Sequence, residues 1–124
     1  MGGERGEARA KPEPMGSQSE RRQSARYPLD SGLVARPAGH RDRVIRGRIL
    51  DLSRAGLSAV IAADLQLGDV LELQFGLPYA AKPVLMEAAV CNREGYRYGL
   101  EFVRVAPPQQ ELINRSCASL ALLR

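Results

Sequence analysis

The sequence has no tryptophan, a single histidine and only two cysteines among its 124 residues. His40 has no second imidazole or carboxylate at ligand spacing, so we expect no metal site and no cofactor. Cys91 and Cys117 lie in neither a CxxC motif nor a Cys/His cluster, and we interpret them as reduced, partly buried thiols. These shortages argue against a metal centre, a disulfide scaffold and cysteine-based chemistry.

Long apolar segments are also missing. No run approaches the roughly 20 apolar residues that a membrane-spanning helix needs. Residues 1–20 carry charges throughout and lack the apolar stretch of a signal peptide. We therefore expect no membrane span and a cytoplasmic location.

Lysine is scarce, so the formal net charge of +4 comes almost entirely from arginine. Many of these guanidinium groups fall in the first half of the chain, namely Arg21, Arg22, Arg26, Arg36, Arg41, Arg43, Arg46, Arg48 and Arg54. Such a field favours an anionic ligand, whatever its identity.

The body of the chain has the apolar alternation of β-strands. Leu71, Leu73 and Phe75 alternate with polar residues, and the same period of two recurs over residues 84–90 and, after a turn at 92–95, over 96–102. Further strands are predicted at 26–35, 43–52 and 57–61. The fold class is therefore mainly β, a six-stranded antiparallel barrel that closes on itself to avoid exposed edges.

Both ends differ from this body. Pro107 and Pro108 mark the start of a C-terminal α-helix over residues 107–123, whose apolar side chains fall on one face. Residues 1–19 offer almost nothing to bury and are predicted to be a disordered tail. The remaining domain, residues 20–124, then comprises a flexible N-terminal arm at 20–27, the barrel at 27–105 and the helix.

Two short polar motifs carry the chemistry. The first, Arg22-Gln-Ser-Ala-Arg26, offers planar cations that can grip a phosphate, bind the O6/N7 edge of guanine or stack on its face. The second runs from Asp51 to Gly56. Asp51 can accept from the guanine N1–H and N2–H2 groups, and Ser53 can donate to a phosphate oxygen. Because Asp51 and Ser53 are two residues apart, we expect their side chains to project to the same side of an extended segment. We expect Gly56 to adopt a backbone angle that a side chain would resist. Asp51 and Ser53 could instead simply stabilise a turn.

Together, in this order and ahead of a run of strands, the RxxxR and DxSxxG motifs resemble the PilZ domain, the bacterial receptor module for cyclic di-GMP. The resemblance covers residues 19–124 and includes Leu67-Gly68-Asp69 and the run Tyr98-Gly-Leu-Glu-Phe102. It implies that the chain binds cyclic di-GMP as a non-catalytic receptor, the arm closing over ligand held on the barrel.

The same resemblance implies the site residues and their roles. Arg22 and Arg26 would embrace the phosphates and a guanine, Asp51 and Ser53 would hold ligand from the barrel surface, and Gly56 would shape the turn. Arg21 could stack on a second guanine. We therefore expect two nucleotides for each chain.

Other functions are weighed against this one. No nucleophile–base pair is apparent, so we do not expect an enzyme. The main alternative is a nucleotide-independent PilZ adaptor that docks onto a motility or pilus machine, and a downstream protein partner is expected but not identified. Binding to DNA or RNA is not expected, because it usually needs aromatic stacking platforms. Most tyrosines and phenylalanines of this chain fall at positions that the alternation predicts to face inward.

Overall fold

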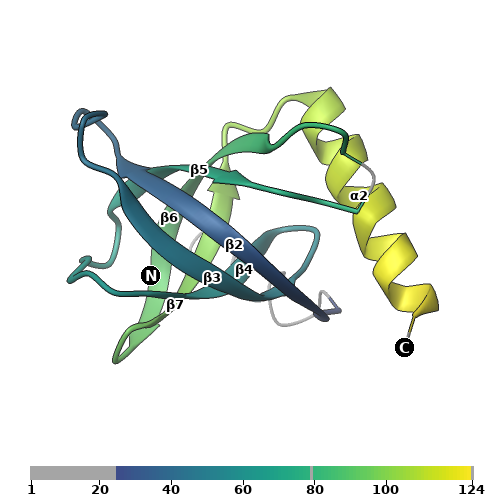
Figure 1. Cartoon of the computed structure of the whole chain (residues 1–124), viewed down its shortest axis with the longest axis horizontal. Coiled ribbons are helices and arrows are strands. Elements are labelled where there is room, and N and C mark those ends of the chain that lie inside the picture. Colours follow the sequence, from purple (N-terminus) through teal and green to yellow (C-terminus); the bar gives the residue numbers. More distant parts are fainter. Residues whose placement is uncertain (1–24, 79, 124) are drawn as a thin grey trace, which may run out of the picture.

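The computed structural model describes residues 25–78 and 80–123, which form a closed β-barrel with one α-helix beside it (Figure 1). The strands are β2 (Tyr27–Pro37), β3 (Ile45–Leu52), β4 (Gly56–Ile61), β5 (Val70–Phe75), β6 (Val84–Glu94) and β7 (Arg97–Val103), and the helix is α2 (Pro107–Leu122). Around the barrel the order is β2-β3-β4-β7-β6-β5, and every neighbouring pair is antiparallel. The predicted fold class is confirmed. The predicted tail, residues 1–19, lies outside the described residues, as does most of the predicted arm.

The barrel interior is filled by alternate side chains of its strands. Leu71, Leu73 and Phe75 of β5 are buried, as are Tyr98 and Leu100 of β7. Fully burying such a side chain contributes on the order of 1.5–3 kcal/mol, so the alternation seen in the sequence is the main source of the fold's stability.

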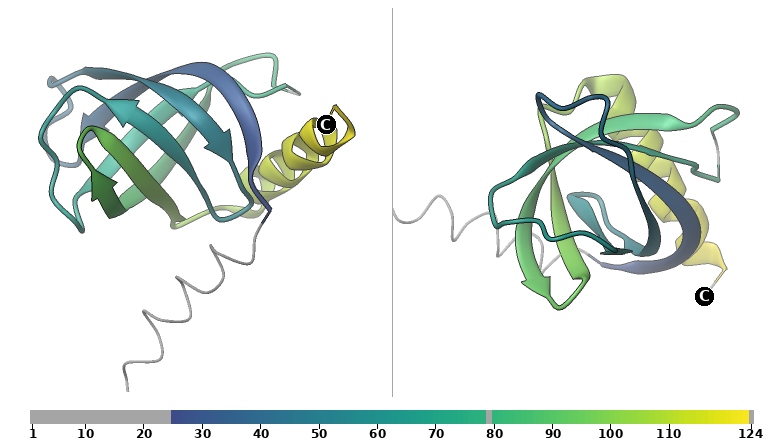
Figure 2. Two further views of the ribbon diagram at one scale, coloured as in Figure 1. Left: turned by 90° about the horizontal axis from the view of Figure 1, so that it is seen from below. Right: turned by 60° about the vertical axis from the view of Figure 1, so that its left-hand side comes forward.

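Helix α2 packs outside the ring, at one end of the barrel (Figure 2). Its start is tied to the sheet by Gln109, whose Oε1 accepts from the Ala106 N–H at 2.7 Å and whose Nε2 donates to the Leu85 carbonyl at 2.6 Å. Ile113, Cys117 and Leu120 form its buried face. The helix therefore acts as a lid on the barrel core.

Irregularities interrupt three of the strands. The register shifts between Pro28 and Ser31 in β2, between Ile49 and Asp51 in β3, and between Val90 and Asn92 in β6. A β-bulge adds a residue to one strand and re-aims the side chains that follow it. The irregularities in β3 and β6 decide which residues face the candidate site.

The β6–β7 hairpin differs from the sequence-based expectation. The turn was placed at residues 92–95, but β6 runs on to Glu94. Tyr96, expected to face inward, lies in the turn with 53% of its surface exposed. The expectation was wrong because the alternation in β6 breaks at the bulge after Val90 rather than at the end of the strand.

Candidate ligand-binding site

The structure brings one residue of each polar motif into direct contact. Arg26 Nη1 donates to Asp51 Oδ1 at 3.1 Å and to Ser58 Oγ at 2.7 Å. The Asp51 side chain is 17% exposed and that of Arg26 37% exposed, so the pair sits at the barrel surface and is partly shielded from water. A guanidinium, a carboxylate and a hydroxyl thus meet at one point.

The sheet register explains why Asp51 faces outward. Ile49 and Leu52 both point into the core, and the irregularity between Ile49 and Asp51 turns the carboxylate to the outer surface. There Asp51 pairs with Ser58 across β3 and β4. Ser58 was missed from the sequence. The available signal was its place in β4, where it is a polar residue between the inward-facing Leu57 and Ala59.

Ser53 has a different surrounding from the one expected. It is 2% exposed, and its Oγ accepts from the Ala55 and Gly56 N–H groups at 3.3 and 3.2 Å and donates to the Gly56 carbonyl at 3.2 Å. Strand β3 ends at Leu52, so Ser53 belongs to the turn that follows it. In this structure Ser53 stabilises the turn, which was the alternative left open by the sequence.

Gly56 begins β4 and is buried, and its carbonyl also accepts from the Ser53 N–H at 2.8 Å. The described glycines with positive φ are Gly39, Gly68 and Gly95. The expected backbone angle at Gly56, one that a side chain would resist, is therefore wrong. This tight Ser53–Gly56 turn lies directly beyond the Asp51 end of β3.

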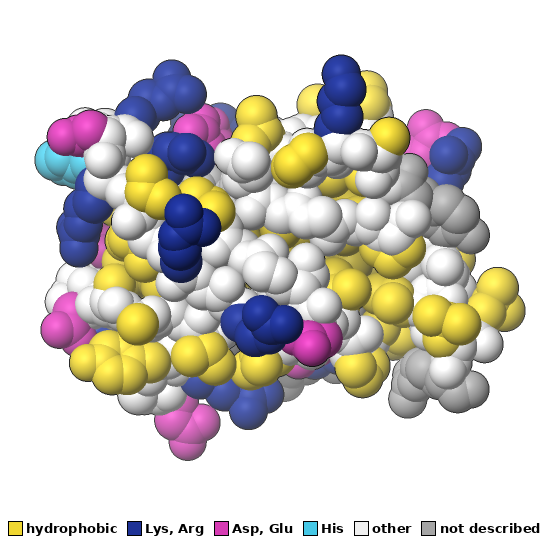
Figure 3. All heavy atoms as spheres, viewed as in Figure 1, with side chains coloured by type: hydrophobic (Ala, Val, Ile, Leu, Met, Phe, Trp, Pro, Cys, Tyr) yellow, Lys and Arg dark blue, Asp and Glu magenta, His cyan; other side chains and the backbone are white. Residues whose placement is uncertain are grey.

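Arg21 and Arg22 lie outside the described residues, so their placement stays a prediction. Two described arginines of the first half pair with carboxylates outside the two motifs. Arg41 pairs with Glu72 at 3.5 Å and Arg48 with Asp30 at 2.6 Å. In Figure 3 the basic side chains are spread over the barrel, while apolar side chains gather on the side that carries α2. On the face shown, the described basic side chains are therefore distributed rather than gathered in a single patch.

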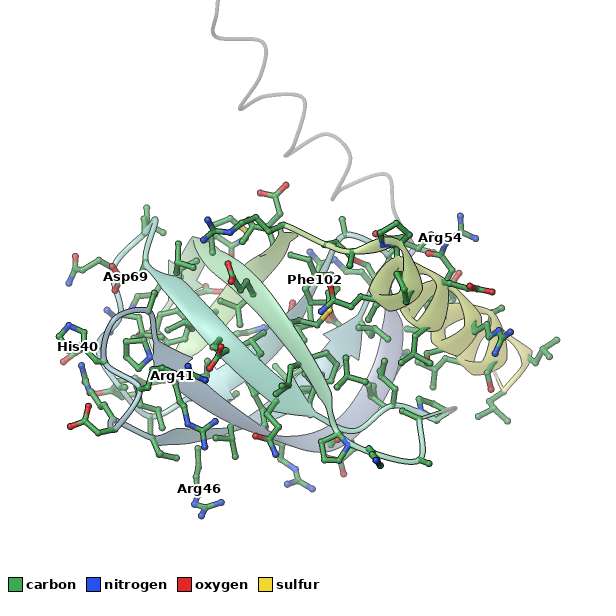
Figure 4. The ribbon with its side chains drawn as sticks, turned by 90° about the horizontal axis from the view of Figure 1, so that it is seen from above. His40, Arg41, Arg46, Arg54, Asp69 and Phe102 are labelled. Carbon is green, nitrogen blue, oxygen red and sulfur yellow. The ribbon has the colours of Figure 1, made fainter. Side chains whose placement is uncertain are left out.

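Arg54 links the second motif to helix α2. It lies beside the helix, at the opposite end of the barrel from His40 and Arg41 (Figure 4). Its carbonyl accepts a hydrogen bond from Gln110 Nε2 at 3.3 Å. Burial raises the pKa of the nearby Cys117 thiol, and the positive charge of Arg54 partly opposes that shift. The motif turn is thus in direct contact with the C-terminal helix.

The described residues form a hollow that lies away from the two polar motifs. This hollow of about 200 Å³, lined in part by Pro37, Arg41 and Arg104, lies at the other end of the barrel. Within residues 25–78 and 80–123, no three His, Cys, Asp or Glu side chains gather closely enough to hold a metal ion. In the same residues, no helix has the length and apolar character to cross a membrane. At the motifs, the side chains of Arg26 and Asp51 remain partly exposed, so a ligand can reach them.

Solved structures similar to this one include PilZ domains. The PilZ domain with c-di-GMP of YcgR from Escherichia coli has a TM-score of 0.65 at 20% identity, over 83% of this chain and 93% of that one. The PilZ domain of CeSA from a cellulose-synthesizing bacterium gives 0.64 at 17% identity, over 79% and 99%. The Bacillus subtilis inhibitor of motility (MotI/DgrA) gives 0.66 at 20% identity, over 82% of this chain and 52% of that one.

These identities are low, and the likenesses show the fold alone. A search of curated proteins gave no match. The family model for the PilZ domain, however, matches residues 20–119, which include both polar motifs, the whole barrel and most of α2. The chain belongs to the PilZ domain family.

Proposed function

We propose that this protein binds cyclic di-GMP as a non-catalytic, cytoplasmic receptor. The observation that carries the proposal is the contact of Arg26 with Asp51 and Ser58. It unites the two motifs at one surface point, with a planar cation for a phosphate or a guanine edge beside an acceptor for guanine N–H groups. The E. coli YcgR domain that shares the fold is in complex with c-di-GMP, which supports the same ligand here.

In the proposed complex, ligand replaces the internal partners of these side chains. Arg26 turns from Asp51 to a phosphate, and Asp51 then accepts from the N1–H and N2–H2 groups of a guanine. Ser53 transfers its donation from the Gly56 carbonyl to a phosphate oxygen, while Gly56 keeps the turn tight. Arg22 completes the grip from the arm, and Arg21 stacks on a second guanine.

Calorimetric titration of the purified protein with cyclic di-GMP tests this function. We expect micromolar or tighter affinity and two nucleotides for each chain, falling toward one in Arg21→Leu. Arg22→Ala, Arg26→Ala and Asp51→Ala should each weaken binding at least tenfold, or ~1.4 kcal/mol, because each removes a charged contact.

A matched control is Arg48→Ala, because Arg48 pairs with Asp30 on the neighbouring strand β2 and belongs to neither motif. Its affinity should equal that of the wild type. Absence of binding by the folded wild type, or wild-type affinity in all three motif variants, would reject the site. Such a result would favour the nucleotide-independent adaptor.

A further inference from the structure

Asp51 and Ser58 begin a row of residues that continues across the next two strands. Ser58 of β4 pairs with Gly99 of β7, and Gly99 pairs with Asn92 of β6. Cross-strand partners in an antiparallel sheet share a face, so Asp51, Ser58, Gly99 and Asn92 all belong to the outer surface. Because adjacent strands lie about 4.8 Å apart, the row spans roughly 14 Å from its first backbone to its last.

A bulge places Asn92 on this surface. Val84, Met86, Ala88 and Val90 of β6 all point into the core, so strict alternation would aim Asn92 inward as well. The register shift between Val90 and Asn92 turns it outward. The shift before Asp51 in β3 does the same, so matching irregularities deliver a polar side chain to each end of one row.

The side chain of Asn92 is exposed and lies over Gly99. A Cβ added at Gly99 would lie 2.5 Å from Asn92 Nδ2 and 2.6 Å from its Oδ1, distances that real Cβ atoms essentially never show. The glycine therefore makes room for the carboxamide on the strand next to Ser58. In the residues that the structure describes, Asn92 Nδ2 makes one recorded hydrogen bond, a 3.9 Å contact with the weak acceptor Cys91 Sγ.

We propose that Asn92 is a base-reading residue of the cyclic di-GMP site, an inference that rests on the proposed function. Guanine presents N1–H and N2–H2 donors on one edge and the acceptors O6 and N7 on another. Asp51 can serve only the donor edge. The Asn92 carboxamide, at the other end of the row, supplies an N–H donor for O6 or N7 of a base that lies across the row.

Titration of Asn92→Ala, Asn92→Asp and the wild type with cyclic di-GMP tests this role. Asn92→Ala should lower affinity on the order of tenfold, since it removes a base contact. Asn92→Asp should lower it further, because it loses the donor and sets a negative charge beside an anionic ligand. Gln74→Ala is the matched control, an amide truncation on strand β5 where it pairs with Leu85 near the start of β6, and should bind as the wild type does.

Cyclic di-IMP lacks the N2 amino group of guanine. It therefore distinguishes the contact of Asp51 with the donor edge of the base from the contact of Asn92 with the acceptor edge. The fold-loss caused by Asn92→Ala should be the same with both ligands, whereas that of Asp51→Ala should shrink with cyclic di-IMP. Wild-type affinity in a folded Asn92→Ala, or a loss that shrinks as that of Asp51→Ala does, would overturn the role of Asn92 alone. Failure of the wild type to bind either ligand would reject the cyclic di-GMP site itself and this role with it.

Discussion

Two serine hydroxyls near Asp51 have different roles. The Ser53 hydroxyl is closed into its own turn, where two backbone N–H groups share it as an acceptor. The Ser58 hydroxyl instead accepts from Arg26, whose side chain is 37% exposed. Loss of the first would leave buried backbone groups unpaired, while loss of the second would leave a cation that water can reach.

We expect Ser53→Ala to lower the free energy of unfolding by about 1–3 kcal/mol, the cost of unpaired buried donors. Ser58→Ala should cost less than Ser53→Ala, because Arg26 can turn to solvent. Urea unfolding measures both, and Ser58→Thr is a control that keeps the hydroxyl. Equal stability of Ser53→Ala and the wild type would contradict the role of Ser53 in the turn.

Helix α2 has a buried face and an exposed end. Ile113 is fully buried, whereas Leu122 and Leu123 are 85% and 79% exposed. The apolar residues of the helix are therefore of two kinds, and only those of the buried face hold it on the barrel.

We expect Ile113→Ala to lower the free energy of unfolding by about 2–5 kcal/mol, through lost burial and the cavity it leaves. Leu122→Ala, the same class of truncation on an exposed side chain, should change it by less than about 0.5 kcal/mol. Denaturant unfolding compares the two variants. A small effect at Ile113 would show that the helix does not close the core.

The sequence was sufficient to predict the barrel and the helix, and less so the site. Every second side chain of β5 is buried, so the apolar alternation in the sequence was enough to predict this strand. The bulge before Asn92 breaks the alternation without any local signal, which hid the outward facing of that residue, whereas the surface position of Asp51 was expected from the motif resemblance. Ser58 was missed for a related reason: its importance comes from its register with Asp51, which is a property of the sheet.

Ligand binding should also be visible in the stability of the whole molecule. A ligand that binds only the folded state at 100 times its dissociation constant contributes about 2.7 kcal/mol. For a domain of this size, that corresponds to a rise in Tm on the order of 10 °C. Calorimetric melting with and without cyclic di-GMP measures the shift. Asp51→Ala at the same ligand concentration should shift less, and an equal shift would place the ligand elsewhere.

The closure of the barrel limits how a protein partner can recognise this chain. Each of the six described strands has a hydrogen-bonded neighbour on both sides. Within the described barrel, a partner therefore finds no open sheet edge to which it could add a strand of its own, a common route by which β-proteins capture extended peptides. A partner must therefore recognise the barrel through its side chains and loops. A ligand that rearranges side chains on the outer surface of the barrel then also changes the surface to which the partner binds.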